Sequence, residues 1–148
     1  MRISSSVSVF LFSFFSLLPF MVWTIVAMTN SSILGYSGVQ LFASYAAIML
    51  SFLNGIISGQ ILNRPPKRYS RRIMAGCHAI TLFAWITILM GVPTLAVLIL
   101  LLGYISAFWL EARFLKLLFS TTSGHSKIHF SLVTVICVLH VIVIFPQY

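Results

Sequence analysis

The stretch Arg64-Pro65-Pro66-Lys67-Arg68-Tyr69-Ser70-Arg71-Arg72 separates two long apolar segments and carries five of the nine Lys and Arg residues of the chain. The apolar segments, residues 39–62 and 73–90, are each long enough to cross a hydrocarbon core of roughly 30 Å as a helix. The two prolines cannot continue the first helix. Because loops rich in Lys and Arg stay on the cytoplasmic side, the stretch predicts two spans joined on that side.

Composition agrees with a membrane location. The 148 residues are 60% hydrophobic and only 7% charged, which leaves too few polar groups to cover a water-facing surface. In a soluble protein the formal charge of +8 would suggest nucleic acid. In a membrane protein, the same cations orient the helices and contact anionic lipid headgroups. The expected partner is therefore the lipid bilayer, and no binding of nucleic acid is expected.

The remaining connections follow the same alternation. Along the chain they carry one, none, five, none, three and none of the Lys and Arg residues. This pattern predicts an all-α membrane protein of five transmembrane helices, with its amino terminus inside and its carboxyl terminus outside. A single integral membrane domain, residues 1–148, is expected. The predicted spans are residues 7–28, 39–62, 73–90, 94–110 and 129–145.

Three features refine these spans. The first begins like a signal peptide, but its apolar run is longer than a usual signal core and no small-x-small cleavage site follows, so we expect a retained helix. Gly91-Val92-Pro93 leaves room only for a tight turn, so the third and fourth spans should form a hairpin. Charged and apolar residues alternate after Leu110, which could form an interfacial helix.

The second span contains small residues at every fourth position. A continuous strip of small side chains lets another helix approach closely, as in small-xxx-small packing. The candidate helix-packing residues are Ala43, Ala47, Ser51, Gly55 and Gly59.

Groups that could carry catalysis are few. Glu111 is the only acidic residue, which excludes paired-carboxylate hydrolysis and carboxylate-rich metal sites within one subunit. Cys77 and Cys137 lie in separate apolar segments, and His78 and His140 have no second histidine at helical metal-binding spacing, so these four are interpreted as packing residues. No nucleophile, phosphate or dinucleotide motif is present. The sequence predicts a noncatalytic protein without a cofactor or a metal ion.

Two sets of polar residues are candidate sites. The first set contains four residues that map to the inner half of the second, third and fourth spans and could line an inward-facing polar pocket: Asn54, Gln60, His78 and Glu111. The cations are assigned to topology and to lipid headgroups: Arg64, Lys67, Arg68, Arg71, Arg72, Arg113, Lys116 and Lys127.

The stretch from Tyr45 to Gly59, YAAIMLSFLNGIISG, resembles the signature of a small membrane family of unknown function. That family includes bacterial inner-membrane proteins and the mitochondrial transmembrane protein sixty-nine. Leu17-Leu18-Pro19-Phe20 and Trp109-Leu110-Glu111-Ala112-Arg113 are similar to two further family stretches. The chain departs from the pattern at Asn54, where the family has the first glycine of a pair, and at Ile57-Ser58, where it has His-Trp. The resemblance implies about five spans and a bacterial inner-membrane or mitochondrial location, but no reaction.

These observations favour an accessory or packing subunit of a membrane assembly, bound to another membrane protein or to itself. The location expected is the bacterial inner membrane or, alternatively, the mitochondrial inner membrane. The alternative function is a small transporter or ion-coupled channel that uses the polar pocket. A lipid-acting enzyme would need a strong nucleophile or a metal cluster, for which the sequence offers no motif.

Overall fold

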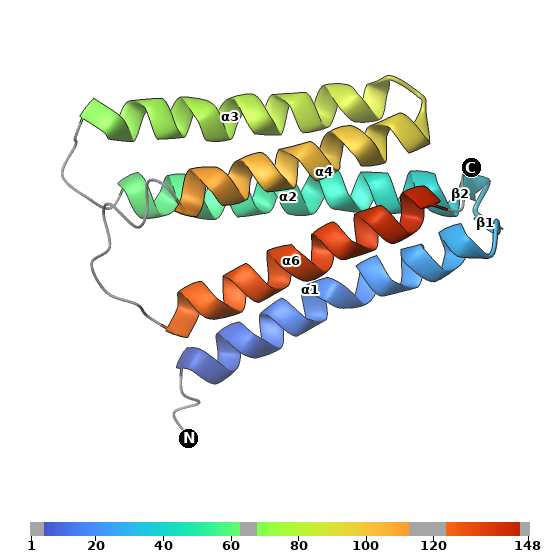
Figure 1. Cartoon of the computed structure of the whole chain (residues 1–148), viewed down its shortest axis with the longest axis horizontal. Helices are drawn as coiled ribbons and strands as arrows, with labels where there is room; N and C mark the ends of the chain where they lie inside the picture. Colours follow the sequence, from blue (N-terminus) through green and yellow to red (C-terminus); the bar gives the residue numbers. More distant parts are fainter. Residues whose placement is uncertain (1–4, 63–67, 113–123, 146–148) are drawn as a thin grey trace.

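The computed structural model describes residues 5–62, 68–112 and 124–145, with the backbone alone for residues 5–13, 60, 68–70 and 124–129. Five α-helices make up most of these residues, and successive helices run antiparallel (Figure 1). They are α1 (Ser5–Met28), α2 (Gly38–Leu62), α3 (Arg68–Leu89), α4 (Pro93–Leu110) and α6 (Gly124–Ile144). The predicted all-α fold is confirmed.

The helix bounds differ from the predicted spans mainly at two amino-terminal ends. Helix α3 begins at Arg68 rather than at residue 73, and α6 begins at Gly124 rather than at residue 129. An apolar run marks only the part of a helix that suits hydrocarbon, whereas backbone hydrogen bonding continues through the polar residues beyond it. The predicted interfacial helix falls largely on residues 113–123, which lie outside the described residues. Just before them the backbone widens into a π-type turn at residues 111–112.

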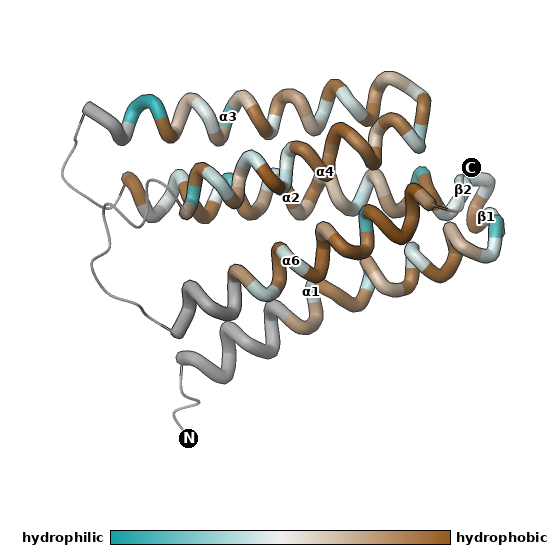
Figure 2. Tube along the Cα trace, in the orientation of Figure 1, coloured by the Kyte–Doolittle hydropathy of each residue, from teal (hydrophilic) through white to brown (hydrophobic). Residues whose placement is uncertain are grey.

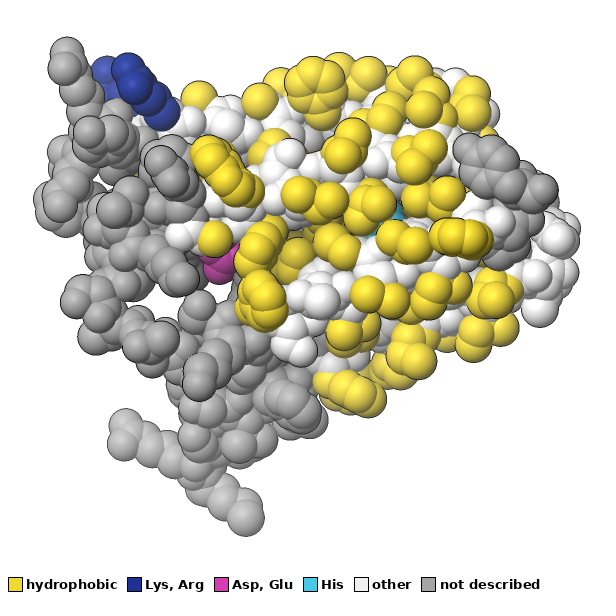
Figure 3. Space-filling view, in the orientation of Figure 1, with side chains coloured by type: hydrophobic (Ala, Val, Ile, Leu, Met, Phe, Trp, Pro, Cys, Tyr) yellow, Lys and Arg dark blue, Asp and Glu magenta, His cyan; other side chains and the backbone are white. Residues whose placement is uncertain are grey.

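Length and composition make three of the helical stretches able to cross a membrane: Gly38–Gly59, Arg71–Leu89 and Pro93–Leu110. Shorter apolar segments, Phe14–Met28 and Phe130–Ile144, belong to α1 and α6. Most described residues of α4 and α6 are hydrophobic, whereas hydrophilic residues lie near the beginning of α3 (Figure 2). Hydrophobic side chains also dominate the described surface in Figure 3. These features indicate a membrane protein.

Four helices form a ring, and the fifth lies outside it. Helix α1 contacts α2 and α6, and α4 contacts α2 and α6, which closes the ring. Helix α3 packs against α2 and α4 from outside. Only 22% of the apolar stretch of α3 is buried, against 50% for α2. Most of α3 therefore faces the surroundings of the bundle.

The end of α1 is closed by a Schellman motif. The Ser31 amide donates to the Val26 carbonyl and the Asn30 amide donates to the Ala27 carbonyl, both at 3.2 Å. Asn30 has a φ of 49°, in the left-handed region that this motif requires. These bonds satisfy carbonyls that the helix end would leave without partners.

A short hairpin then reverses the chain into α2. Its strands, β1 (Ser32–Ile33) and β2 (Tyr36–Ser37), are joined by Leu34 and Gly35, both with positive φ, as in a type I′ turn. The Ser37 hydroxyl accepts the Gln40 amide hydrogen at 3.2 Å and so caps α2.

The α3–α4 connection is as tight as predicted. Gly91 has a φ of 69°, where only glycine is unstrained, and Pro93 begins α4 in a position that needs no amide hydrogen. The two helices contact each other along the hairpin.

Gly38 lies where the backbones of α1 and α2 approach closely. A Cβ atom built on Gly38 would lie 2.6 Å from the Ala27 Cα and would overlap the Ala27 nitrogen. Because the obstacle is backbone rather than a flexible side chain, the two helix ends would have to separate to admit a methyl group.

We expect Gly38→Ala to lower the free energy of unfolding by roughly 1–3 kcal/mol, the usual cost of an extra methyl group in a packed region. Denaturant or thermal unfolding in mild detergent measures it. Gly55→Ala in the same helix is the matched control, because a Cβ there meets no atom within 4 Å in the part of the chain that the structure describes. Equal stability of the two variants would contradict the close approach.

Candidate functional site

A cluster of rings around His140 occupies the centre of the four-helix ring. Phe20 of α1, Phe42 of α2, Tyr104 of α4 and His140 of α6 are each completely buried. The His140 ring centroid lies 4.8 Å from that of Phe42 and 5.2 Å from that of Tyr104, both edge to face. The Phe20 centroid lies 6.2 Å away. These are favourable aromatic separations, and each ring comes from a different helix, so the cluster joins all four.

Hydrogen bonding assigns the tautomer of His140. Its Nδ1 atom lies 2.8 Å from the Ile136 carbonyl oxygen, one turn earlier in α6. A carbonyl only accepts, so Nδ1 carries the hydrogen, and in the neutral ring Nε2 then carries the lone pair. Nε2 is buried and has no hydrogen-bond partner in the described part of the chain. The ring is thus held by one local bond and by aromatic packing.

Two tyrosine hydroxyls join neighbouring helices beside this cluster. Tyr104 donates to the Ala46 carbonyl at 2.9 Å, and Tyr45 donates to the Ser16 carbonyl at 3.0 Å. The second bond lies close to Pro19 of α1. Because Pro19 has no amide hydrogen, the helical bond to the Phe15 carbonyl is missing, one residue before the carbonyl that accepts from Tyr45.

Asn54 on α2 is the least satisfied polar side chain in the described residues. It is 1% exposed, and both its amide oxygen and its amide nitrogen lack a hydrogen-bond partner there. A buried polar group without a partner typically costs about 1–3 kcal/mol. Ser58, one turn further along, is also buried and lies against the Cys77 thiol.

The other members of the predicted polar pocket lie in different surroundings. His78 is exposed on α3, and its Nδ1 lies 2.8 Å from the Met74 carbonyl oxygen of its own helix. Glu111 is half-buried after α4, and its amide hydrogen bonds to the last helical carbonyls. The side chain of Gln60 lies outside the described residues. Asn54 is buried in the bundle, whereas His78 is exposed on its surface. A pocket shared by all four residues stays a prediction.

The α2 strip of small residues, Ala43, Ala47, Ser51, Gly55 and Gly59, is buried along only half its length. Ala43 and Ala47 belong to the hydrophobic core, Ser51 is half-buried, and the two glycines are exposed. A spacing of four residues gains about 40° per step on a helix of 3.6 residues per turn. The strip therefore winds from the core to the outer surface of the bundle.

The described cations lie at one end of the bundle. Arg71 and Arg72 are exposed at the beginning of α3, and Glu111 lies at the same end (Figure 3). The backbone at Arg68 and Lys127 is helical, but their side chains lie outside the described residues. Also outside them are Arg64, Lys67, Arg113 and Lys116.

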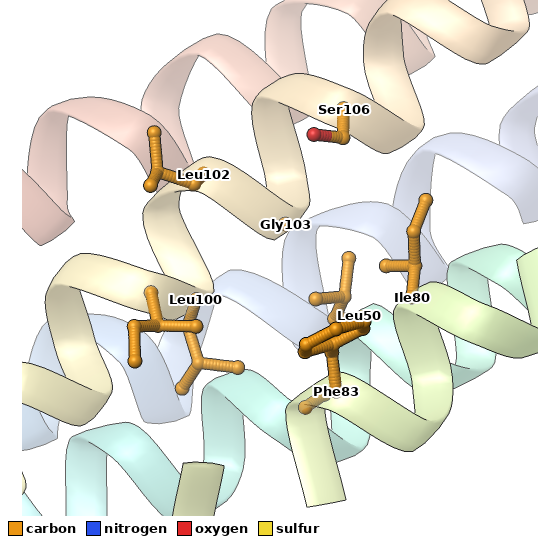
Figure 4. A pocket seen from close by; sticks show the side chains of 9 residues that line it. Leu50, Ile80, Phe83, Leu100, Leu102, Gly103 and Ser106 are labelled. Atoms are coloured by element: carbon orange, nitrogen blue, oxygen red, sulfur yellow. The ribbon is translucent and has the colours of Figure 1, made fainter. Parts of the chain in front are cut away.

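An apolar groove of about 200 Å³ opens between α3 and α4. Ile80 and Phe83 line it from α3, Leu102 and Gly103 line it from α4, and Leu50 of α2 closes its floor (Figure 4). Asn54, His78 and Glu111, the three members of the predicted polar pocket whose side chains the structure describes, do not line this groove.

The described residues contain no group of three His, Cys, Asp or Glu side chains that could hold a metal ion. Cys77 is buried, Cys137 is half-buried, and neither forms a disulfide.

Comparison with known proteins identifies a family. A family model described as "Protein of unknown function (DUF3429)" covers residues 6–145. The chain belongs to this family. The resemblance to a family of unknown function is thereby confirmed for this DUF3429 protein. No curated protein and no solved structure matches the chain significantly.

The ring cluster around His140 is the feature that sequence reasoning missed in this DUF3429 protein. A signal for it exists in α6, where Val133, Ile136, His140 and Val143 recur at helical spacing and are all buried. The signal is weak because the intervening positions are apolar too, so no polar face marks which side of α6 packs inward.

Replacing His140 by Ala should remove a ring from the centre of the bundle and lower the free energy of unfolding by roughly 2 kcal/mol or more. His140→Phe keeps an aromatic ring and should cost less, because the lost hydrogen bond is only to the preceding turn. Unfolding in detergent compares the two variants. Equal loss from both would show that the hydrogen bond, rather than the ring, matters.

Asn54→Leu should leave stability unchanged or raise it by up to about 1–3 kcal/mol, since an apolar side chain of the same branching replaces a buried amide without partners. The stability of Ser58→Ala is the comparison, because Ser58 is buried on the same face of α2 but lies against the Cys77 thiol. A clear loss of stability in Asn54→Leu would mean that the amide has partners in the folded protein.

Proposed function

We propose that this DUF3429 protein is a noncatalytic accessory subunit of a membrane assembly. It would bind another membrane protein, or a second copy of itself, through the exposed half of the α2 strip. The observation that supports this is the openness of Gly55 and Gly59, where an added Cβ would meet no atom of the described residues within 4 Å. Two exposed glycines four residues apart let the backbone of a partner helix approach closely.

The surface beside these glycines suits a partner helix. Phe52 is 60% exposed and Leu62 is 67% exposed, and both lie on the same side of α2 as Gly55 and Gly59. Large apolar side chains flanking a glycine furrow provide dispersion contacts around a close backbone approach, which is the main attraction between helices in lipid.

The membrane topology belongs to the same proposal. All five helices would cross the bilayer, with the amino terminus inside and the carboxyl terminus outside. The exposed Arg71 and Arg72 lie at one end of the bundle, whereas the β1–β2 hairpin and the α3–α4 turn lie at the other and carry no charged residue. The positive-inside rule supports this orientation. The resemblance to a family that includes bacterial inner-membrane proteins and a mitochondrial protein supports a bacterial inner membrane or, alternatively, the mitochondrial inner membrane.

The double substitution Gly55→Leu and Gly59→Leu should abolish association, because the new side chains fill the furrow. They face outward, so monomer stability should change little. The double substitution Ala75→Leu and Ala79→Leu on α3 is the matched control, since both alanines are exposed and share the spacing. Co-purification and mass measurement in mild detergent show whether each variant still associates with its partner or with a second copy. Association that survives the glycine substitutions would contradict the proposal.

A small transporter or ion-coupled channel is the second candidate, and the unsatisfied amide of Asn54 favours it. Buried polar groups inside membrane domains often mark a substrate path. Flux in proteoliposomes that is lost in both Asn54→Leu and Glu111→Gln would support transport, and absence of flux would count against it.

A further inference from the structure

We propose that the face formed by α3 and α4 binds one anionic phospholipid, with its phosphate at Arg72 and an acyl chain in the apolar groove. This site is distinct from the α2 strip and does not depend on the subunit role.

The groove has the chemistry of an acyl-chain site and room for part of one chain. Its lining is apolar except for the exposed hydroxyl of Ser106 on α4 (Figure 4). One turn of a helix with a diameter of about 10–12 Å and a pitch of 5.4 Å fills roughly 400–600 Å³. The groove, at about 200 Å³, is too small to hold even one such turn. Phe83 and Leu102, at its sides, are 66% and 63% exposed, so the groove opens outward from the bundle. A lipid can therefore enter it sideways.

The register of α3 connects this groove to a cation. Arg72, Gly76, Ile80 and Phe83 recur at intervals of four, four and three residues, which places them along one helix face. From Arg72 to Ile80 this face spans about 12 Å, and from Arg72 to Phe83 about 17 Å, close to the thickness of one hydrocarbon leaflet.

Gly76 lies between the cation and the groove and presents no side chain. A Cβ there would lie 3.4 Å from the Leu110 side chain, so α3 and α4 are close at this level. The surface path from Arg72 to Ile80 passes Gly76 and the apolar Leu110 side chain that lies against it, so an acyl chain on this path would pack on Leu110.

Charge selects the class of lipid. Arg71 and Arg72 are both exposed at the beginning of α3, and a guanidinium group binds a phosphate with two parallel hydrogen bonds. A zwitterionic lipid would fit the groove equally well but would gain less at the basic end, because its headgroup carries a compensating positive charge.

Native mass spectrometry of the full chain in mild detergent tests the site. Phosphatidylglycerol should be retained more strongly than phosphatidylcholine with the same acyl chains. Arg72→Gln should weaken phosphatidylglycerol binding about fivefold, the effect of one cation near an anionic surface. Arg71→Gln is the matched control, since Arg71 lies one residue out of register, and it should weaken binding less. Ser106→Phe should reduce retention by filling the groove, whereas Ser131→Phe, at an exposed position of α6, should not.

Three results would overturn the proposal. Equal retention of the two lipids would remove the requirement for an anionic headgroup. Equal losses in Arg71→Gln and Arg72→Gln would indicate attraction to the basic end in general. Unchanged retention in Ser106→Phe would show that the headgroup binds without the groove, and the arginine variants keep the test decisive if Ser106→Phe fails to fold.

Discussion

Hydrocarbon offers no hydrogen bonds and poor solvation of charge, and this constraint arranges the polar groups of the bundle. Several serine and threonine hydroxyls bond to carbonyls of their own helix, as Thr24 does to Phe20, Thr87 to Phe83 and Ser51 to Ala47. The hydroxyls of Tyr45 and Tyr104 bond to carbonyls of neighbouring helices. The exposed Arg71 and Arg72 lie at one end. Asn54 and His140 Nε2 are the exceptions in the described residues, and both are buried inside the bundle.

The same constraint makes shape the main source of specificity between the helices. Lipid tails are as apolar as the bundle core, so burial of apolar surface contributes little to helix association. The described contacts are accordingly close and specific. Gly38 lies against the backbone of Ala27, Leu50 lies against Gly103, and the rings of Phe42, Tyr104 and His140 meet edge to face. Helix α2 takes part in all three kinds of contact.

The sequence predicted the helices well and their inward faces poorly. Apolar runs located all five helices, and errors occurred at Arg68 and Gly124, where helices extend into polar sequence. In α6 nearly every position is apolar, so the pattern could not show that His140 points to the centre. Asn54 and His78 were grouped by depth along their helices, which says nothing of rotation, and one is buried while the other is exposed. The small residues at every fourth position of α2 likewise seemed to share one face, but the strip winds around the helix and is exposed at Gly55 and Gly59.

The proposed topology requires that the basic end of the bundle and the β1–β2 hairpin lie on opposite sides of the membrane. Single cysteines at Leu34→Cys, in the hairpin, and at Arg71→Cys, at the basic end, test this in a background of Cys77→Ser and Cys137→Ser. A membrane-impermeant maleimide added to intact cells should label the hairpin cysteine, and should label the other only after the membrane is permeabilised. Labelling of both cysteines from the same side would contradict the topology.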